Sequence, residues 1–149
     1  MKIIQMNLDD FGIYHNVEWN PPEKGLIVMH GQNESGKTTL MKYVRSMFFG
    51  YQRGDWRGYK GHMDIRRDDG HEYRIYRNEK ESYMTDGDLT IHEEPAELWW
   101  HGLDRRTYDQ VFAMGLEDLQ GFKILASEEV RSHRQRYSQG ILPGQGTEA

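Results

Sequence analysis

One short segment constrains this chain more than any other, because it fits a pattern with a known backbone shape. The segment matches G-x-x-x-x-G-K-[ST]. An apolar run at residues 25–30 precedes it, and residues 37–49 carry apolar side chains at helical spacing. Between a strand and a helix, the pattern predicts a loop that binds phosphate groups. The predicted site consists of Gly31, Gln32, Asn33, Glu34, Ser35, Gly36, Lys37, Thr38 and Thr39.

The parts of this predicted loop have separate chemical roles. Its glycines allow successive backbone N–H groups to point at one anion, and the helix that follows adds its positive dipole end. Lys37 is expected to contact the β- and γ-phosphates, and the Thr38 hydroxyl to bind Mg²⁺. Thr39 either contacts phosphate or packs on the helix. We therefore predict binding of ATP with Mg²⁺; the alternative is a degenerate loop that keeps the shape without binding.

Composition excludes several other classes of protein. The chain has no cysteine, which excludes disulfides and thiolate metal sites, and with an ATP site this favours the cytoplasm. No run of about 18 apolar residues exists, so no transmembrane helix is expected. The net charge of −5 argues against a chain-wide electrostatic attraction to nucleic acid. Seven scattered histidines lack the spacing of a metal site.

The periodicity of apolar residues predicts the order of the elements. Gly50 is expected to end the first helix, and Asp68-Asp69-Gly70 and Asp86-Gly87 to form hairpin turns. Asp104 and Ser127 are expected helix N-caps. The continuous apolar run at residues 25–30 predicts a strand buried on both faces. Expected strands occupy residues 2–8, 16–20, 25–30, 62–67, 71–77, 82–84 and 89–92, and expected helices occupy residues 37–49, 96–101, 105–114 and 128–137.

This order separates the chain from other folds that carry the same loop. A doubly wound kinase or small GTPase would alternate strands and helices after the loop, whereas here antiparallel hairpins follow the first helix. The fold class is therefore predicted as α/β, a P-loop NTPase that resembles the N-terminal lobe of an ABC-type ATPase. Its mixed or antiparallel sheet would pack around the P-loop helix. We expect one lobe at residues 1–138 and a flexible tail at residues 139–149.

Three stretches make the resemblance more specific. They are MNLDDFGIYHN at residues 6–16, HGQNESGKTTL at residues 30–40 followed by Phe-Phe-Gly at 48–50, and YDQVFAMGLEDL at residues 108–119. Together they resemble the AAA-type domain of YhaN-like proteins, within the SbcC/RecN/SMC class of DNA-repair ATPases. Two positions depart from that family: Gly12 replaces a frequent Arg or Lys, and Leu116 stands where many relatives have a glutamine that senses Mg²⁺.

The resemblance implies that this chain is part of an ATPase head. In that class a coiled coil follows the N-terminal lobe, and a C-terminal lobe supplies the Walker B strand and the signature motif. Neither an apolar run ending in Asp-Glu nor Ser-Gly-Gly-Gln occurs here, and no catalytic residue is identifiable. The implied partners are the C-terminal lobe, a second head, DNA and an SbcD-like nuclease subunit, with no membrane. We expect a role in DNA repair or DNA-end processing, and nucleotide binding without efficient hydrolysis by this chain alone.

A second candidate site lies in the glycine-rich segment at residues 50–61. Arg53, Trp56, Arg57 and Lys60 combine cations with an aromatic ring, which suits contacts to nucleic acid. The same composition suits cation–π pairs that only order a surface loop. Two further functions stay open: a self-contained small P-loop NTPase or kinase, and a nucleotide-independent module for dimerisation or DNA docking.

Overall fold

The computed structural model describes residues 1–32, 35–52 and 58–111 of the 149 residues. The chain divides into two compact units, Met1–Thr107 and Tyr108–Ala149. The first unit contains the sheet and the first two helices. Of the second unit, residues 108–111 are described. The helix expected at residues 128–137 and the tail at residues 139–149 lie outside the described part of the chain, as does most of the stretch at 108–119.

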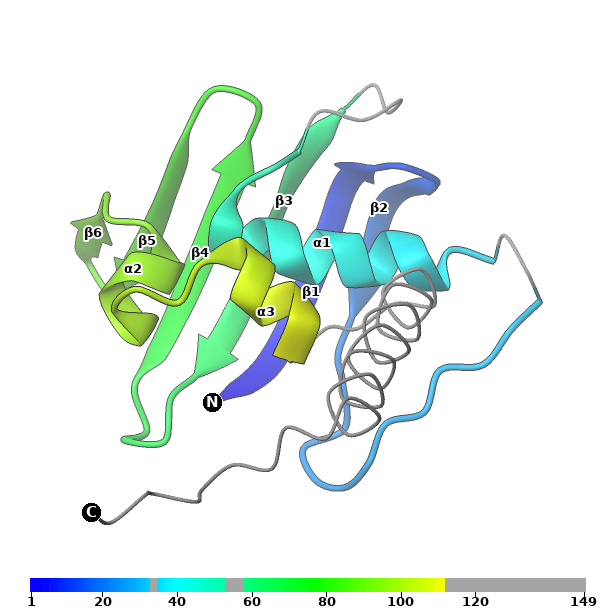
Figure 1. The fold of residues 1–149 in the computed structure, drawn as a ribbon, viewed down its shortest axis with the longest axis horizontal. Coiled ribbons are helices and arrows are strands. Elements are labelled where there is room, and N and C mark those ends of the chain that lie inside the picture. Colours follow the sequence, from blue (N-terminus) through cyan, green and yellow to red (C-terminus); the bar gives the residue numbers. More distant parts are fainter. Residues whose placement is uncertain (33–34, 53–57, 112–149) are drawn as a thin grey trace, which may run out of the picture. The chain divides into compact units, whose positions relative to one another are not determined.

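Six strands of the described chain form one antiparallel sheet in the order β2-β1-β3-β4-β5-β6 (Figure 1). Every pair of neighbours is antiparallel, which confirms the antiparallel hairpins expected after the first helix. The strands are β1 (Lys2–Phe11), β2 (Tyr14–Trp19), β3 (Tyr59–Arg66), β4 (Glu72–Asn78), β5 (Ser82–Asp86) and β6 (Leu89–Ile91).

The first hairpin is tighter than the sequence pattern suggested. Strand β1 continues to Phe11, which pairs with Tyr14, so that only Gly12 and Ile13 form the turn. The sequence predicts a strand that ends at residue 8, before the two aspartates. Asp10 pairs with His15 on β2 and with Lys60 on β3, which keeps it in the strand, and Asp9 lies at the register shift between β1 and β3. Gly12 has a φ of 61°, which glycine adopts without the cost of a Cβ.

Helix α1 (Lys37–Phe49) has the bounds that the sequence predicts. Its buried face includes Tyr43, Met47 and Phe48, the positions expected from helical spacing. Gly50 ends the helix with a φ of 89°, and its N–H donates to the carbonyl of Ser46 at 2.9 Å. No helix in the described residues is both long and apolar enough to cross a bilayer.

Helix α1 lies on one face of the sheet and closes the hydrophobic core against it (Figure 1). Fully buried side chains alternate along the strands, as the pleat of a sheet requires. On β1 and β3 these include Met6, Leu8, Met63 and Ile65. Among the residues that the structure describes, the hydrophobic core therefore lies on one face of the sheet.

Helix α2 (Pro95–Trp100) extends this core beyond the C-terminal end of α1. Trp100 lies 4.8 Å from Phe48 between ring centroids, and Trp99 lies 5.3 Å from Tyr73. The Trp99-Trp100 pair therefore packs against the core. Arg77 of β4, whose side chain is only 6% exposed, is paired with Glu94 at 2.5 Å just before α2. This ion pair connects the sheet to the start of α2.

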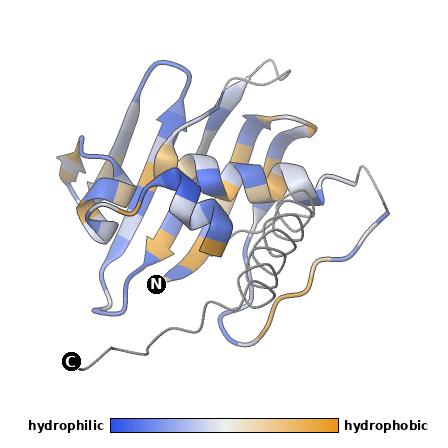
Figure 2. Ribbon diagram, in the orientation of Figure 1, coloured by the Kyte–Doolittle hydropathy of each residue, from blue (hydrophilic) through white to orange (hydrophobic). Residues whose placement is uncertain are grey.

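The prediction of a buried strand at residues 25–30 is wrong. The segment has no regular secondary structure, and all six of its residues are exposed. Leu26 is 90% exposed and Val28 is 74% exposed. Figure 2 shows these apolar residues on the stretch of chain between β2 and α1. A strand needs a hydrogen-bonded neighbour, and within the described chain this segment pairs with no strand of the sheet.

Candidate phosphate-binding site

The start of α1 leaves its backbone N–H groups available to an anion. Gly36 is the N-cap, buried, with a φ of 93°, and no side chain accepts a hydrogen bond from the first turn. The first turn also contains no acidic residue. Since the first N–H groups of a helix have no partner within the helix, this end carries a partial positive charge.

The Lys37 side chain folds back over the loop that precedes the helix. Its ammonium donates hydrogen bonds to the carbonyl of Gly31 at 2.6 Å and the carbonyl of Gln32 at 2.8 Å. A third bond joins it to the Ser35 hydroxyl at 3.2 Å. The side chain stays exposed. The positive charge therefore lies inside the curve of the loop and close to the helix N-terminus.

The described parts of the loop are held in this curve by contacts of their own. The Ser35 N–H donates to the carbonyl of Gln32 at 3.2 Å. A Cβ on Gly31 would lie 2.6 Å from the Ser35 hydroxyl, so a larger residue would displace it. Thr38 is exposed in the first turn of α1, and Thr39 is half-buried. Asn33 and Glu34 lie outside the described residues.

The tip of the first hairpin lies against this loop, which the sequence alone did not indicate. The Tyr14 hydroxyl donates to the carbonyl of Gly36 at 3.1 Å. A Cβ on Gly36 would come within 2.5 Å of that hydroxyl and 2.6 Å of the Ile13 side chain. The sequence signal for this contact is the turn at Gly12-Ile13. A prediction of that turn would have made Tyr14 the first residue of β2, at the tip of the hairpin.

This arrangement fits a phosphate group better than a directly bound metal ion. Exposed N–H groups, a lysine ammonium and the Thr38 hydroxyl are the donor set that a phosphate and its Mg²⁺ require. Within the described residues, no group of three or more His, Cys, Asp or Glu could hold a metal ion by itself. These residues therefore suit Mg²⁺ that is bound to the phosphates of a nucleotide.

The nucleic-acid candidates fall mostly outside the described chain. Arg53, Trp56 and Arg57 are not described, while Lys60 is exposed on β3. Of the neighbouring aromatics, Tyr51 and Tyr59 lie 5.8 and 6.0 Å from the Phe11 ring, between centroids. Those two rings therefore contribute to the core, which favours the structural interpretation for them. The role of Arg53, Trp56, Arg57 and Lys60 stays a prediction.

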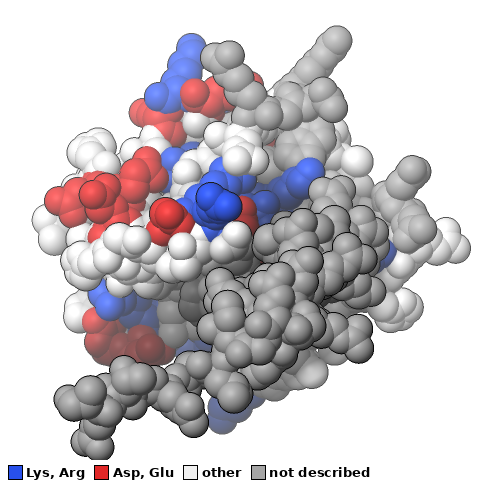
Figure 3. Space-filling view, in the orientation of Figure 1, with Lys and Arg blue, Asp and Glu red and all other residues white. Residues whose placement is uncertain are grey.

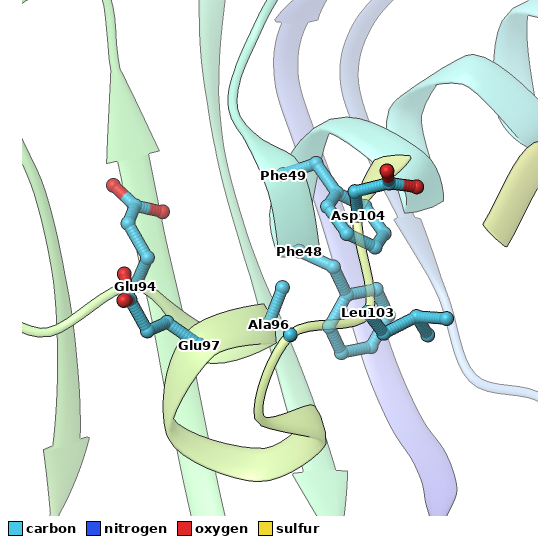
Figure 4. A pocket seen from close by; sticks show the side chains of 8 residues that line it. Phe48, Phe49, Glu94, Ala96, Glu97, Leu103 and Asp104 are labelled. Carbon is cyan, nitrogen blue, oxygen red and sulfur yellow. The ribbon is translucent and has the colours of Figure 1, made fainter. Parts of the chain in front are cut away.

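A separate cavity of about 270 Å³ lies between the end of α1 and helix α2 (Figure 4). Its base is apolar, with Phe48, Phe49 and Leu103. Glu94 and Glu97 line one side, and acidic atoms gather on this part of the surface, where β6 and α2 lie (Figure 3). The cavity is thus unsuited to an anion such as phosphate, and it opens at the opposite end of α1 from Lys37.

Comparison with known proteins places the chain in a family. The family described as AAA domain matches residues 1–130. The uncharacterized protein YhaN of Bacillus subtilis (strain 168) is 24% identical over 139 residues, which cover 82% of this chain and 14% of that relative. The chain thus spans about a seventh of the length of the relative it matches. Since the family model covers most of its 149 residues, this chain belongs to the AAA domain family, whose domains are of the ATPase type.

Proposed function

We propose that the loop at residues 31–39 binds the phosphates of ATP together with Mg²⁺. One observation carries the proposal: Lys37 begins an uncapped helix, and its ammonium is already held inside the loop by the carbonyls of Gly31 and Gln32. A triphosphate would replace those carbonyls as the partner of the ammonium. Charge-assisted bonds to phosphate are stronger than bonds to neutral carbonyls.

The individual residues then take the roles expected of them. Backbone N–H groups of Gly31, Gln32, Asn33, Glu34, Ser35 and Gly36 would contact the phosphates once ATP is bound. Lys37 would bind the β- and γ-phosphates, and Thr38 and Thr39 lie at the start of α1. The Thr38 hydroxyl is the ligand that this chain offers to Mg²⁺, which neutralises charge on the phosphates when it is bound.

We further propose that this unit is the N-terminal lobe of an SbcC/SMC-like ATPase head. The exposed apolar segment at residues 25–30 supports this proposal. Leu26 and Val28 expose most of their surface, and large apolar side chains in a contiguous exposed run mark a surface that another element covers. A strand of a C-terminal lobe would cover this segment and pair its backbone.

The wider context of this head is a proposal that rests on the resemblance. A second head would complete the ATP site by dimerisation, and DNA and an SbcD-like nuclease subunit would be partners in DNA repair or DNA-end processing. Hydrolysis would then depend on a carboxylate from outside this chain. The relative YhaN, of which this chain matches 14%, offers the corresponding length for such lobes.

Titration of a fluorescent ATP analogue, with and without Mg²⁺, tests the nucleotide site. Wild-type chain is expected to bind, and Lys37→Ala to weaken binding roughly 10- to 100-fold, because a charge-assisted bond is worth about 1.5–3 kcal/mol. Lys80→Ala is the matched control, since it removes an exposed lysine from the β4–β5 turn. Equal affinity for wild type and Lys37→Ala would contradict the proposal, and a wild-type chain that binds no nucleotide would favour a nucleotide-independent module.

Phosphate release by the purified chain tests whether the site is complete. We expect little or no turnover, since the proposed catalytic carboxylate belongs to another lobe. Rapid release that Lys37→Ala abolishes would contradict the half-site proposal and favour a self-contained NTPase or kinase.

A further inference from the structure

Tyr14 is joined to the candidate site by a contact that spans 22 residues of sequence. It lies at the start of β2, next to the two-residue turn of the first hairpin, and its hydroxyl donates to the carbonyl of Gly36 at 3.1 Å. The same carbonyl accepts the N–H of Leu40 at 2.9 Å, the first hydrogen bond of helix α1. The Gly36 carbonyl therefore has a helical partner and a partner from the hairpin.

The packing around this contact leaves Gly36 no room to move toward the hairpin. A Cβ at Gly36 would lie 2.5 Å from the Tyr14 hydroxyl and 2.6 Å from the Ile13 side chain. Gly36 is buried although Lys37 and Thr38 beside it are exposed. The hairpin tip thus fixes the loop at its last residue before the helix, on the side away from solvent.

We propose that Tyr14 is a positioning residue of the phosphate loop. This inference rests on the proposed ATP site and adds a residue to it that contacts no nucleotide itself. The carbonyl of Gly36 and the N–H of Lys37 belong to one planar peptide unit, so a bond to the carbonyl oxygen also orients that N–H. In a helix the carbonyl points along the axis and the N–H points out of the N-terminus, toward the anion.

The bond from Tyr14 acts on this peptide unit in two ways. It restricts rotation of the Gly36–Lys37 peptide, which glycine, with its wide range of backbone conformations, would otherwise allow. It also polarises the peptide, and a carbonyl that accepts two hydrogen bonds makes its N–H a better donor. The first effect orients the Lys37 N–H before phosphate binds, which lowers the cost of binding, and the second strengthens the bond that it then makes.

The test compares Tyr14→Phe with wild type for two probes, Mg-ATP and inorganic tripolyphosphate with Mg²⁺. At 3.1 Å the bond is at the long end for O–H···O, so we expect a modest loss, roughly 2- to 5-fold in affinity. The loss should be the same factor for both probes, because Tyr14 acts on the phosphate loop. Tyr83→Phe is the matched control: it removes the hydroxyl of another half-buried sheet tyrosine, which packs on Tyr76.

A second readout distinguishes positioning from a general effect on stability. In Tyr14→Phe without ligand, the amide proton of Lys37 should shift upfield in a nitrogen–proton NMR spectrum, while the unfolding midpoint stays close to that of Tyr83→Phe. Unchanged affinity for both probes would overturn the inference and leave the ATP site intact. So would a loss confined to ATP, which would place the effect at the base or sugar. A wild-type chain that binds neither probe overturns the proposed function and this inference together.

Discussion

At the scale of single residues, Tyr43 determines how α1 is seated on the sheet. Its side chain is fully buried, and its hydroxyl lies 2.6 Å from the carbonyl of Asn7 on β1 and 3.1 Å from the carbonyl of His62 on β3. Burial raises the pKa of the Tyr43 hydroxyl well above its ordinary value, so it stays a donor. Gly61 makes room for it: a Cβ there would lie 2.2 Å from the Tyr43 hydroxyl and 2.3 Å from the Asn7 carbonyl.

Gly61→Ala is therefore expected to destabilise the chain by about 1–3 kcal/mol through overpacking. Urea unfolding measures the loss. In the double variant Gly61→Ala/Tyr43→Phe, the hydroxyl that meets the new methyl group is gone, although the Asn7 carbonyl stays. The double variant should lose less stability than the sum of the single variants. Additive losses would show that the two residues do not meet.

At the scale of elements, helix α3 (Arg105–Val111) begins at the N-cap that the sequence predicts. The Thr107 N–H donates to the Asp104 carboxylate at 2.7 Å, which confirms Asp104 as the cap. This backbone bond, with a further bond from the Thr107 side chain, lowers the pKa of Asp104 below its ordinary value of 3.8. A carboxylate with a lowered pKa stabilises the fold above its unfolded-state pKa, and the contribution disappears as pH falls through the folded-state pKa.

We expect Thr107→Ala to raise the pKa of Asp104 only part of the way to 3.8, because the backbone N–H remains after the hydroxyl is lost. Carbon-detected NMR titration of the Asp104 carboxyl carbon measures this directly. The Asp69 carboxyl, whose pKa is lowered mainly by the His71 N–H, serves as an internal reference and should not change. An unaltered Asp104 titration would refute the contribution of the Thr107 hydroxyl.

At the scale of the whole molecule, the described unit has a one-sided core and an apolar segment that lies outside it. Ile75 on β4 is fully buried, whereas Leu26 and Val28 between β2 and α1 are exposed. Burial, not hydrophobicity, decides what a substitution costs. The same change should therefore cost much more stability at a buried apolar residue than at an exposed one.

Leu26→Ser/Val28→Ser should change the free energy of unfolding by less than about 0.5 kcal/mol, as substitutions of exposed residues do. It should also reduce self-association in dynamic light scattering, since the exposed apolar surface is smaller. Ile75→Ser is the comparison and should cost at least about 2 kcal/mol. If the double variant were destabilised as much as Ile75→Ser, the segment would have to be packed in solution.

The sequence by itself determined the features that depend on near neighbours along the chain. Helix α1 has its predicted bounds because its apolar spacing and Gly50 act locally. The turn at Gly70 and the cap at Asp104 follow from residues within three positions of each other. The candidate loop was likewise visible, because its pattern is contiguous and precedes a helix.

Only the tertiary structure decided the features that need a partner far away in sequence. Residues 25–30 have the composition of a strand, but a strand requires a neighbour, and the described sheet supplies none. The contact of Tyr14 with Gly36 and the space that Gly61 leaves for Tyr43 both join residues about twenty positions apart. Composition and periodicity cannot specify such pairs, since hydrogen bonds and close packing depend on the path of the backbone in three dimensions.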